Sequence, residues 1–213
     1  MNNKIRTFKN RKSIRLKGYD YSRSGNYFIT INTYKNKYLF GEVKNGEMVL
    51  NKIGEIIEKD LLELNKKYQN IRCHEYIVMP NHMHFIIEIM EDNKNEIKSW
   101  RTKGWENPIR ADSVGAGSSR PDDSHNPDAS HNPPKDINLG NIIGFYKYLT
   151  TKNYNNFIEN KNEKYHKIWH KSYYDHIVRN QYDFNRISKY IKNNPKKWSS
   201  AGMGSSHPED SIK

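Results

Sequence analysis

Residues 79–89 have the sequence MPNHMHFIIEI, and this pattern predicts a β-strand with two chemically different faces. Side chains along a strand alternate, so residues two apart point to the same side of a sheet. Met83, Phe85, Ile87 and Ile89 make one face wholly apolar, and that face should pack on helices. The other face carries His82, His84, Ile86 and Glu88. Two imidazoles on one strand can hold a divalent cation with water at its open positions, or they are polar-rim histidines without a metal.

Further strands and a hairpin are predicted around this one. The segment NYFITINTY alternates in polarity and is rich in Tyr, Ile and Thr, which is typical of a strand. Asn45-Gly46 is a common two-residue turn of a β-hairpin. The predicted strands span 26–34, 73–79, 82–90 and 167–169, and the hairpin strands span 39–43 and 48–50.

Three helices are predicted from apolar residues that recur at helical spacing. They span residues 53–68, 139–149 and 182–194. The first should begin near Asn51, and Asn180 should cap the third. The third should end at Pro195, because a proline ring does not continue a helix. This order of strands and helices favours an α+β fold, with an antiparallel sheet and helices packed on one face.

Composition and charge favour a polyanionic partner. The chain has 213 residues, which suits one domain with additions, and Lys plus Arg exceed Asp plus Glu by 12. Such a surplus is typical of nucleic-acid binding, although a basic protein without nucleic acid has it too. The single cysteine excludes an internal disulfide and a cysteine-rich zinc site. Because no stretch is long and apolar enough for a membrane span or signal region, we expect a cytoplasmic protein.

Three stretches differ in composition from the rest of the predicted domain, residues 18–198. Residues 1–17 carry seven basic and no acidic residues, which indicates an arm that follows a phosphate backbone or a solvated tail. Residues 104–136 are rich in Pro, Gly, Ser, Asp and Asn, so we expect a low-complexity insertion that interrupts the domain. We expect a disordered tail over 199–213.

The last predicted helix carries a second set of candidate residues. Tyr190 and Asn194 are four residues apart and therefore share a helix face. Tyr190 could be a nucleophile and the Asn194 amide oxygen a metal ligand, or Tyr190 could simply pack in the core. Glu88 is a reserve ligand, since it shares the strand face of the histidines. Trp169 and Trp198 are predicted to be core residues.

Four separated stretches together resemble one protein family. They are residues 11–15 with 18–30, residues 78–84 with their His-hydrophobic-His motif, Trp169 with 174–179, and residues 190–195 with the sequence YIKNNP. The last is similar to the Tyr-Ile-x-x-Asn-Pro ending of that family. On these residues the chain resembles the REP-associated tyrosine transposases, a branch of the single-tyrosine HUH transposases related to those of small bacterial insertion sequences. The order and spacing agree over roughly 11–100 and 138–198.

The resemblance implies a fold, a site and a reaction. The fold is a ferredoxin-like or RRM-like sheet with the HUH strand central. Mg²⁺ or Mn²⁺ would be held by His82, His84 and Asn194, and Tyr190 would be the nucleophile. The reaction is nicking and joining of single-stranded, hairpin-bearing DNA at REP-like or insertion-sequence ends, through a 5′-phosphotyrosine, by a monomer or homodimer. The residues expected to contact the DNA are basic or aromatic: Arg11, Lys12, Arg15, Lys17, Tyr19, Tyr21 and Arg179.

Two other functions remain open from the sequence. A non-catalytic nucleic-acid-binding module derived from such a transposase would have the same charge and sheet, but it would not need His82, His84, Tyr190 and Asn194 together. A metal-dependent hydrolase would use water as its nucleophile and leave no covalent protein–DNA adduct. The general base is also open, since His170, His176 or a water could serve.

Overall fold

The computed structural model describes residues 15, 16, 18–91, 137–159 and 167–200, without the side chains of residues 199 and 200. All of these described residues except Glu91 belong to one compact unit. The predicted insertion at 104–136 lies outside the described residues, as does most of the basic arm and of the tail. None of the helices in the described part of the chain is long and apolar enough to cross a membrane.

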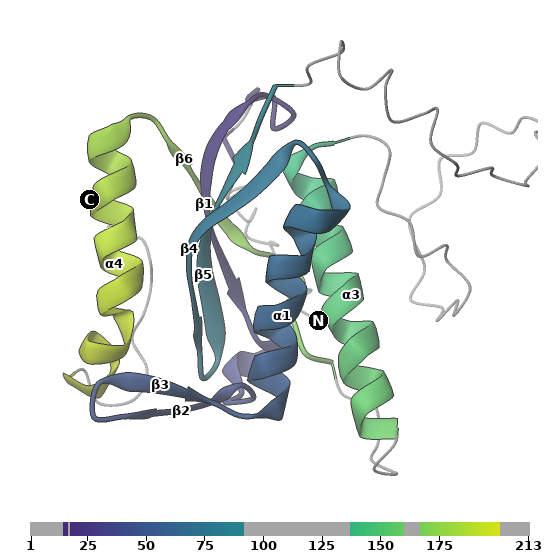
Figure 1. Cartoon of the computed structure of the whole chain (residues 1–213), viewed down its shortest axis with the longest axis vertical. Coiled ribbons are helices and arrows are strands. Elements are labelled where there is room, and N and C mark those ends of the chain that lie inside the picture. The colour runs from purple at the N-terminus through teal and green to yellow at the C-terminus, as the bar shows by residue number, and fades with distance from the viewer. Residues whose placement is uncertain (1–14, 17, 92–136, 160–166, 201–213) are drawn as a thin grey trace, which may run out of the picture. The chain divides into compact units, whose positions relative to one another are not determined.

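A four-stranded antiparallel sheet forms the centre of this unit (Figure 1). Its strands lie in the order β4-β5-β1-β6. The strands are β1 (Gly25–Asn32), β4 (Ile71–Met79), β5 (His82–Ile89) and β6 (Tyr174–Val178). With α1 between β1 and β4 and α3 between β5 and β6, this is the βαββαβ topology of a ferredoxin-like domain. The predicted α+β fold, with the histidine-bearing strand in the middle of the sheet, is confirmed.

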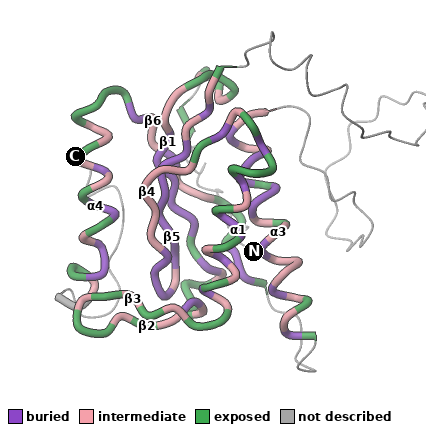
Figure 2. Tube along the Cα trace, in the orientation of Figure 1, coloured by how far each residue is buried: buried purple, intermediate pink, exposed green. Residues whose placement is uncertain are grey.

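Helices cover both faces of the sheet. α1 (Lys52–Lys67) and α3 (Leu139–Glu159) pack on one face, whereas α4 (Gln181–Ser200) packs on the other (Figure 1). The prediction that the helices share one face therefore holds for α1 and α3 but not for α4. The reason is that Phe28 and Ile86 point away from the main core and are buried against Ile187 and Ile191 of α4. As a result, β5 is buried along nearly its whole length (Figure 2).

Local sequence signals account for the hairpin and for the starts of two helices. β2 (Gly41–Lys44) and β3 (Glu47–Leu50) pair through the turn at Asn45 and Gly46, whose φ angles of 53° and 78° are both left-handed, as this turn requires. The Asn51 side chain accepts the first free N–H groups of α1, at 3.0 Å. Asn180 accepts the Asp183 N–H at 2.8 Å, so the predicted cap of α4 is confirmed.

Three of these predictions are wrong. α3 does not end at residue 149 but continues to Glu159. α4 does not end before Pro195 but continues through it to Ser200. The lost backbone hydrogen bond is offset by packing, because the ring of Trp198 in the last turn lies against His82. Residues 167–169 form no strand, since only Trp169 bridges to Thr33, and the last strand is β6. The Trp169 indole N–H instead donates to Thr150 of α3, which draws this segment towards the helix.

Candidate active site

His82 and His84 lie at the beginning of β5, on the face that α4 covers. Register places them opposite Asn32 and Thr30 of β1. Their side chains are sealed from solvent, with 2% and 0% of each residue exposed, and their ring centroids are 4.6 Å apart. Two imidazoles are thus held side by side in a buried environment, as the alternation of β5 predicts.

Asn81 fixes the orientation of the first imidazole. Its Nδ2 faces the carbonyl oxygen of Asn36 at 3.5 Å, and its Oδ1 lies 2.7 Å from His82 Nδ1. Because Oδ1 can only accept, Nδ1 carries the proton and Nε2 keeps its lone pair. His82 Nε2 is buried and has no hydrogen-bond partner among the described residues. An oriented imidazole with a free lone pair is the arrangement found in metal sites.

His84 is held between β1 and α4. Its Nδ1 lies 2.8 Å from Thr30 Oγ1, and its Nε2 lies 3.3 Å from the hydroxyl of Tyr190. In the tautomer that a metal ligand needs, Nδ1–H donates to Thr30, and the lone pair of Nε2, which faces the Tyr190 hydroxyl here, is the one that a cation would take. The ring also stacks on Phe28, with centroids 5.4 Å apart. Thr30 and Phe28 therefore position His84 towards α4.

α4 brings Tyr190 and Asn194 to the same place, with 8% and 4% of each residue exposed. The Tyr190 ring contacts the ring of His84 at 5.2 Å and the ring of Phe28 at 6.0 Å. The structure therefore unites the four residues that the sequence singled out: His82, His84, Tyr190 and Asn194. The Nζ atom of Lys197 lies 5.5 Å from the Tyr190 ring and adds a positive charge beside it.

Burial sets the protonation of the site. It lowers the pKa of His82 to about 4 and the pKa of His84 well below its usual range, so both imidazoles are neutral at pH 7. The Asn194 side chain lies close enough to the His82 imidazole to raise this pKa by a smaller amount, although it forms no hydrogen bond to Nε2. Burial also raises the pKa of Tyr190, which Asn194 partly offsets by hydrogen bonding. The site therefore offers lone pairs for a cation, together with a phenol that is hard to ionise without one.

The donor set fits a divalent cation if the amide is counted. Within the described ranges, no group of three or more His, Cys, Asp or Glu side chains could hold a metal ion. The available donors are His82 Nε2, His84 Nε2 and the Asn194 amide oxygen. The unpartnered, buried His82 Nε2 is the observation that favours a metal here, because leaving such an atom unpaired costs stability.

Glu88 is not brought to these residues. It is separated from His84 by Ile86, and its carboxylate lies 2.9 Å from Nε2 of His74 on β4. At roughly 3.3 Å per residue along a strand, Glu88 is about 13 Å from His84.

The two histidines considered as general bases both contact other residues. His176 pairs with Asp183 at 3.0 Å, and His170 accepts the Ser172 N–H at 3.2 Å.

The residues expected to contact DNA are divided between different places. Tyr19 and Tyr21 pack against Tyr27, on the face of the sheet that α1 and α3 cover. Arg15 donates to the Tyr173 hydroxyl at 2.6 Å and lies over the ring of Tyr21. These side chains are thus on the opposite face from Tyr190. Arg179 is exposed between β6 and α4. Arg11, Lys12 and Lys17 lie outside the described residues.

Three residues around the site were not assigned a role from the sequence: Thr30, Asn81 and Trp198. Asn81 stands directly before the first histidine, so its position could have suggested a contact. Thr30 depends on the pairing register of β1 with β5, which no local pattern gives. Trp198 is only half-buried rather than a core residue, because the continuation of α4 through Pro195 carries it to the rim beside His82.

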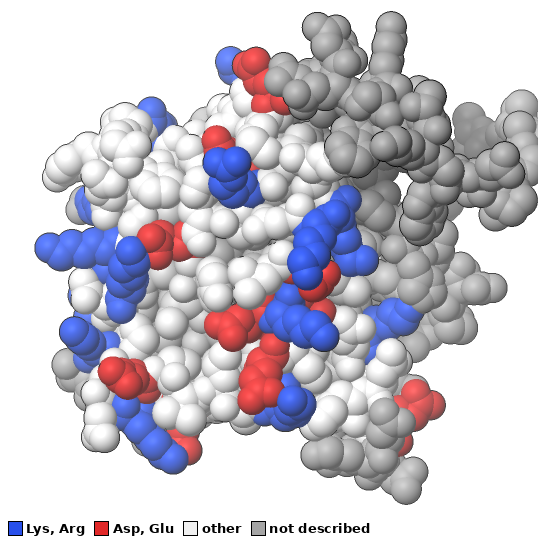
Figure 3. Space-filling view, viewed as in Figure 1, with Lys and Arg blue, Asp and Glu red and all other residues white. Residues whose placement is uncertain are grey.

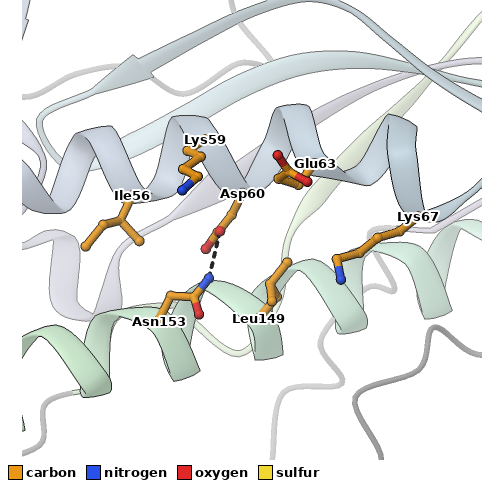
Figure 4. A pocket seen from close by; sticks show the side chains of 7 residues that line it. All are labelled: Ile56, Lys59, Asp60, Glu63, Lys67, Leu149 and Asn153. Atoms are coloured by element: carbon orange, nitrogen blue, oxygen red, sulfur yellow. Dashed lines mark hydrogen bonds between the residues drawn. The ribbon is translucent and has the colours of Figure 1, made fainter.

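A separate pocket of about 360 Å³ lies between α1 and α3 (Figure 4). It contains none of the four site residues. Its most buried polar side chain is Asp60, which accepts a hydrogen bond from Asn153 at 2.7 Å and whose pKa is raised by burial. Lys59 and Lys67 line the same pocket. The pocket thus belongs to the helical layer and not to the histidine site.

Comparison with known proteins gives one relative at the sequence level. No family model matches the chain. An uncharacterised protein of Haemophilus influenzae is 30% identical over 189 residues, which are 88% of this chain and 89% of that protein. The chain belongs to the family of that protein. Because the match covers nearly the whole of both chains, this family shares the complete domain and not an isolated motif.

Two solved structures are similar to the chain at a lower level. A REP-associated tyrosine transposase bound to a REP hairpin gives a TM-score of 0.43 at 15% identity, covering 88% of this chain and 74% of the other. A candidate transposase of Deinococcus radiodurans R1 gives a TM-score of 0.39 at 13% identity, covering 84% of this chain and 95% of the other. Similarity at this level says nothing about the activity of this family, and the resemblance to the transposases stays a prediction.

Proposed function

We propose that the chain is a metal-dependent DNA transposase that nicks and rejoins single-stranded DNA, with Tyr190 as the nucleophile. The observation that carries the proposal is the buried approach of the Tyr190 hydroxyl to His84 Nε2, at 3.3 Å, beside His82 and Asn194. A binding module gains nothing from burying two neutral imidazoles and a tyrosine against one another. A nucleophilic site needs such a group held close to the centre that activates it.

The histidines and Asn194 would hold Mg²⁺ or Mn²⁺ through His82 Nε2, His84 Nε2 and the amide oxygen. When bound, the ion polarises a phosphate oxygen and stabilises charge on the leaving oxygen. Asn81 and Thr30 fix the ring orientations. Because both histidines are already neutral at pH 7, neither has to release a proton before it binds a cation.

Tyr190 would perform the covalent step. Its hydroxyl gives its proton to a base, for which a water would serve, and its oxygen bonds to the scissile phosphorus. The bond from that phosphorus to the 3′-oxygen of the preceding nucleotide breaks, and the released oxygen takes up a proton from water. The products are a 5′-phosphotyrosine and a free 3′-hydroxyl. Attack by another 3′-hydroxyl on the phosphotyrosine reverses the exchange and joins two strands, so no nucleotide cofactor is needed. Burial raises the pKa of the phenol, so its deprotonation would depend on the positive charge nearby, such as that of Lys197.

The charge of the chain supports a DNA substrate. The formal net charge is +12, and lysines are exposed along α4 at positions 189, 192, 196 and 197. Figure 3 shows lysine and arginine side chains gathered at the left edge of the molecule, over α4. Positive side chains beside the nucleophile would hold the phosphate backbone of the strand. From the resemblance, we propose hairpin-bearing strands of the REP or insertion-sequence-end type.

The test is covalent attachment of the protein to labelled DNA. Purified protein is incubated with hairpin-bearing single strands, including native flanking DNA, and Mg²⁺ or Mn²⁺, and the products are separated on a denaturing gel. We expect a slow-migrating adduct that disappears with chelator and in Tyr190→Phe. Tyr182→Phe is the matched control, since this tyrosine is on the same helix but 79% exposed. An adduct that survives in Tyr190→Phe refutes the assignment of the nucleophile.

The same gel separates the competing functions. Strand cleavage without an adduct indicates a metal-dependent hydrolase that uses water. Complexes on a native gel that give neither adduct nor cleavage on the flanking DNA indicate a non-catalytic binding module.

A further inference from the structure

We propose that Trp198 and Tyr38 form a stacking platform for one unpaired base of the DNA strand, next to the phosphate that Tyr190 attacks. The proposal rests on the proposed function, because the phosphate at Tyr190 decides where the neighbouring base lies. It adds a binding subsite for a nucleobase, formed by two aromatic rings at the rim of the histidine site.

The aromatic rings form a continuous path from the buried site to solvent. The Trp198 ring lies 5.7 Å from the ring of His82, with an interplanar angle of 42°. The Tyr38 ring lies 5.8 Å from the Trp198 ring at 72°, in an edge contact. Tyr38 is 51% exposed, and Trp198 is only half-buried. Large aromatic side chains exposed to water cost free energy, so a base that covers these two rings would gain binding free energy.

Hydrogen bonds fix the platform to the turn that carries the histidines. The N–H groups of Leu39 and Phe40, directly after Tyr38, both donate to the carbonyl oxygen of Pro80, at 2.8 and 3.2 Å. The Thr33 N–H donates to the carbonyl oxygen of Asn81 at 2.8 Å. The segment directly after Tyr38 is therefore anchored to Pro80, two residues before His82. A subsite held in this way keeps its distance to the nucleophile without ordering on binding.

The charges beside the platform favour DNA over an apolar protein segment. Lys196 and Lys197 directly precede Trp198, and both are exposed. Lys197 also lies over the Tyr190 ring, with its Nζ atom 5.5 Å from the ring centroid. Aromatic rings next to lysines are the combination that binds single strands, because the rings stack with bases and the lysines hold phosphates. The 72° angle between the two rings means that they do not stack on each other.

The experiment measures binding in a Tyr190→Phe background, so it does not depend on cleavage. Hairpin-bearing strands with a single abasic position, moved along the sequence, are titrated against this protein and against the same protein with Trp198→Ala. We expect about a tenfold loss of affinity at one abasic position with Trp198 present. Trp198→Ala should lower the affinity for intact DNA by a similar factor. The affinity of this variant should then not change further when that position is abasic. Tyr38→Ala should give the same pattern more weakly.

Controls separate stacking from folding and from the proposed function. Trp198→Phe keeps a ring and should retain most of the affinity, and Tyr182→Ala, an exposed tyrosine at the other end of α4, should change nothing. Thermal unfolding shows whether each variant folds. If the abasic position lowers the affinity equally with and without Trp198, or if Trp198→Ala leaves the affinity unchanged, the proposed platform is refuted. If the denaturing-gel assay gives no covalent adduct while the abasic sensitivity still depends on Trp198, the catalytic proposal is refuted and the platform is not.

Discussion

The two faces of the sheet are both buried, but they are built from different chemistry. On the face under α1 and α3, β5 contributes only apolar side chains, among them Met83, Phe85 and Ile87. On the face under α4, the same strand contributes Ile86 between His84 and Glu88, and Thr30 of β1 lies opposite His84. Buried polar groups cost stability unless they are paired. We infer that the sheet face under α1 and α3 stabilises the domain. The face under α4 retains polar groups that folding alone does not require.

The strongest way to break this comparison is to change the second imidazole. His84→Gln keeps an amide beside Thr30 but removes the ring nitrogen that faces Tyr190. We expect the yield of covalent DNA adduct to fall by about a thousandfold or more, since a metal ligand and the partner of the nucleophile are both lost. The free energy of unfolding should fall by no more than about 2 kcal/mol. Ile86→Val, on the same strand face, is the matched control and should keep the adduct.

A substitution on the opposite face should have the reverse effect. Phe85 neighbours His84 in sequence but is fully buried in the main core. Phe85→Ala should lower the free energy of unfolding by about 3–5 kcal/mol, because it removes apolar contacts and leaves a cavity. The adduct formed per folded molecule should stay close to that of the unchanged protein. Urea titration measures the stability, and a loss below about 1 kcal/mol would contradict a division of labour between the faces.

Alternation along β5 is the part of this division that the sequence could predict. Period-two patterning depends only on neighbouring residues, and so do the Asn45-Gly46 turn and the Asn51 cap. The pairing of Thr30 with His84 depends instead on how β1 aligns with β5, which is decided by the whole sheet. The position of α4 was missed for a similar reason, since Phe28 and Ile86 need a cover that becomes evident only when the strands are adjacent.

In the candidate site, too, the residues set by local spacing could be predicted from the sequence and those set by tertiary packing could not. His82, His84, Tyr190 and Asn194 could be named because their spacing is local within one strand and one helix, and because they match motifs of a known family. Glu88 also shares the face of the histidines, but alternation ignores distance, and Ile86 separates it from them. Trp198 was misplaced because Pro195 normally ends a helix, and tertiary packing carried α4 further.

Acid should weaken the polar face in particular. Burial lowers the pKa of His82 to about 4, whereas in the unfolded chain it is near 6.5. The unfolded state therefore binds the proton more readily, and the stability present above pH 6.5 is lost as pH falls towards 4. His82 alone should account for about 3 kcal/mol of this loss. His84 acts in the same direction.

The measurement is urea unfolding of metal-free protein between pH 7 and pH 4. His82→Gln should flatten the profile relative to the unchanged protein, and the difference between the two isolates this residue from the carboxylates. His170→Gln is the control, because this histidine is exposed, whereas His82 is buried. Parallel profiles for the His82 variant and the unchanged protein would mean that the imidazole is not held neutral by burial.

The smallest predicted effect concerns the side chains on the α1 and α3 face that were expected to contact DNA. Arg15 bonds to Tyr173 and lies over Tyr21, away from Tyr190. Arg15→Ala should weaken binding of hairpin-bearing single strands by about threefold and reduce the slope of log affinity against log salt by about 0.7, as one lost phosphate contact would. The adduct yield at saturating DNA should not change, because the arginine is not part of the histidine site.

Lys66→Ala is the matched control, since Lys66 is an exposed cation on α1 that pairs with Glu63. Removing it should leave both the affinity and the salt slope unchanged. If Arg15→Ala has no more effect than this control, the strand contacts the α4 side alone and the two faces are functionally separate. If Arg15→Ala instead abolishes the adduct, the strand must pass around the β6 edge of the sheet to reach Tyr190, because Tyr173 and β6 lie between the two positions. The assignment of function to one face would then be too narrow.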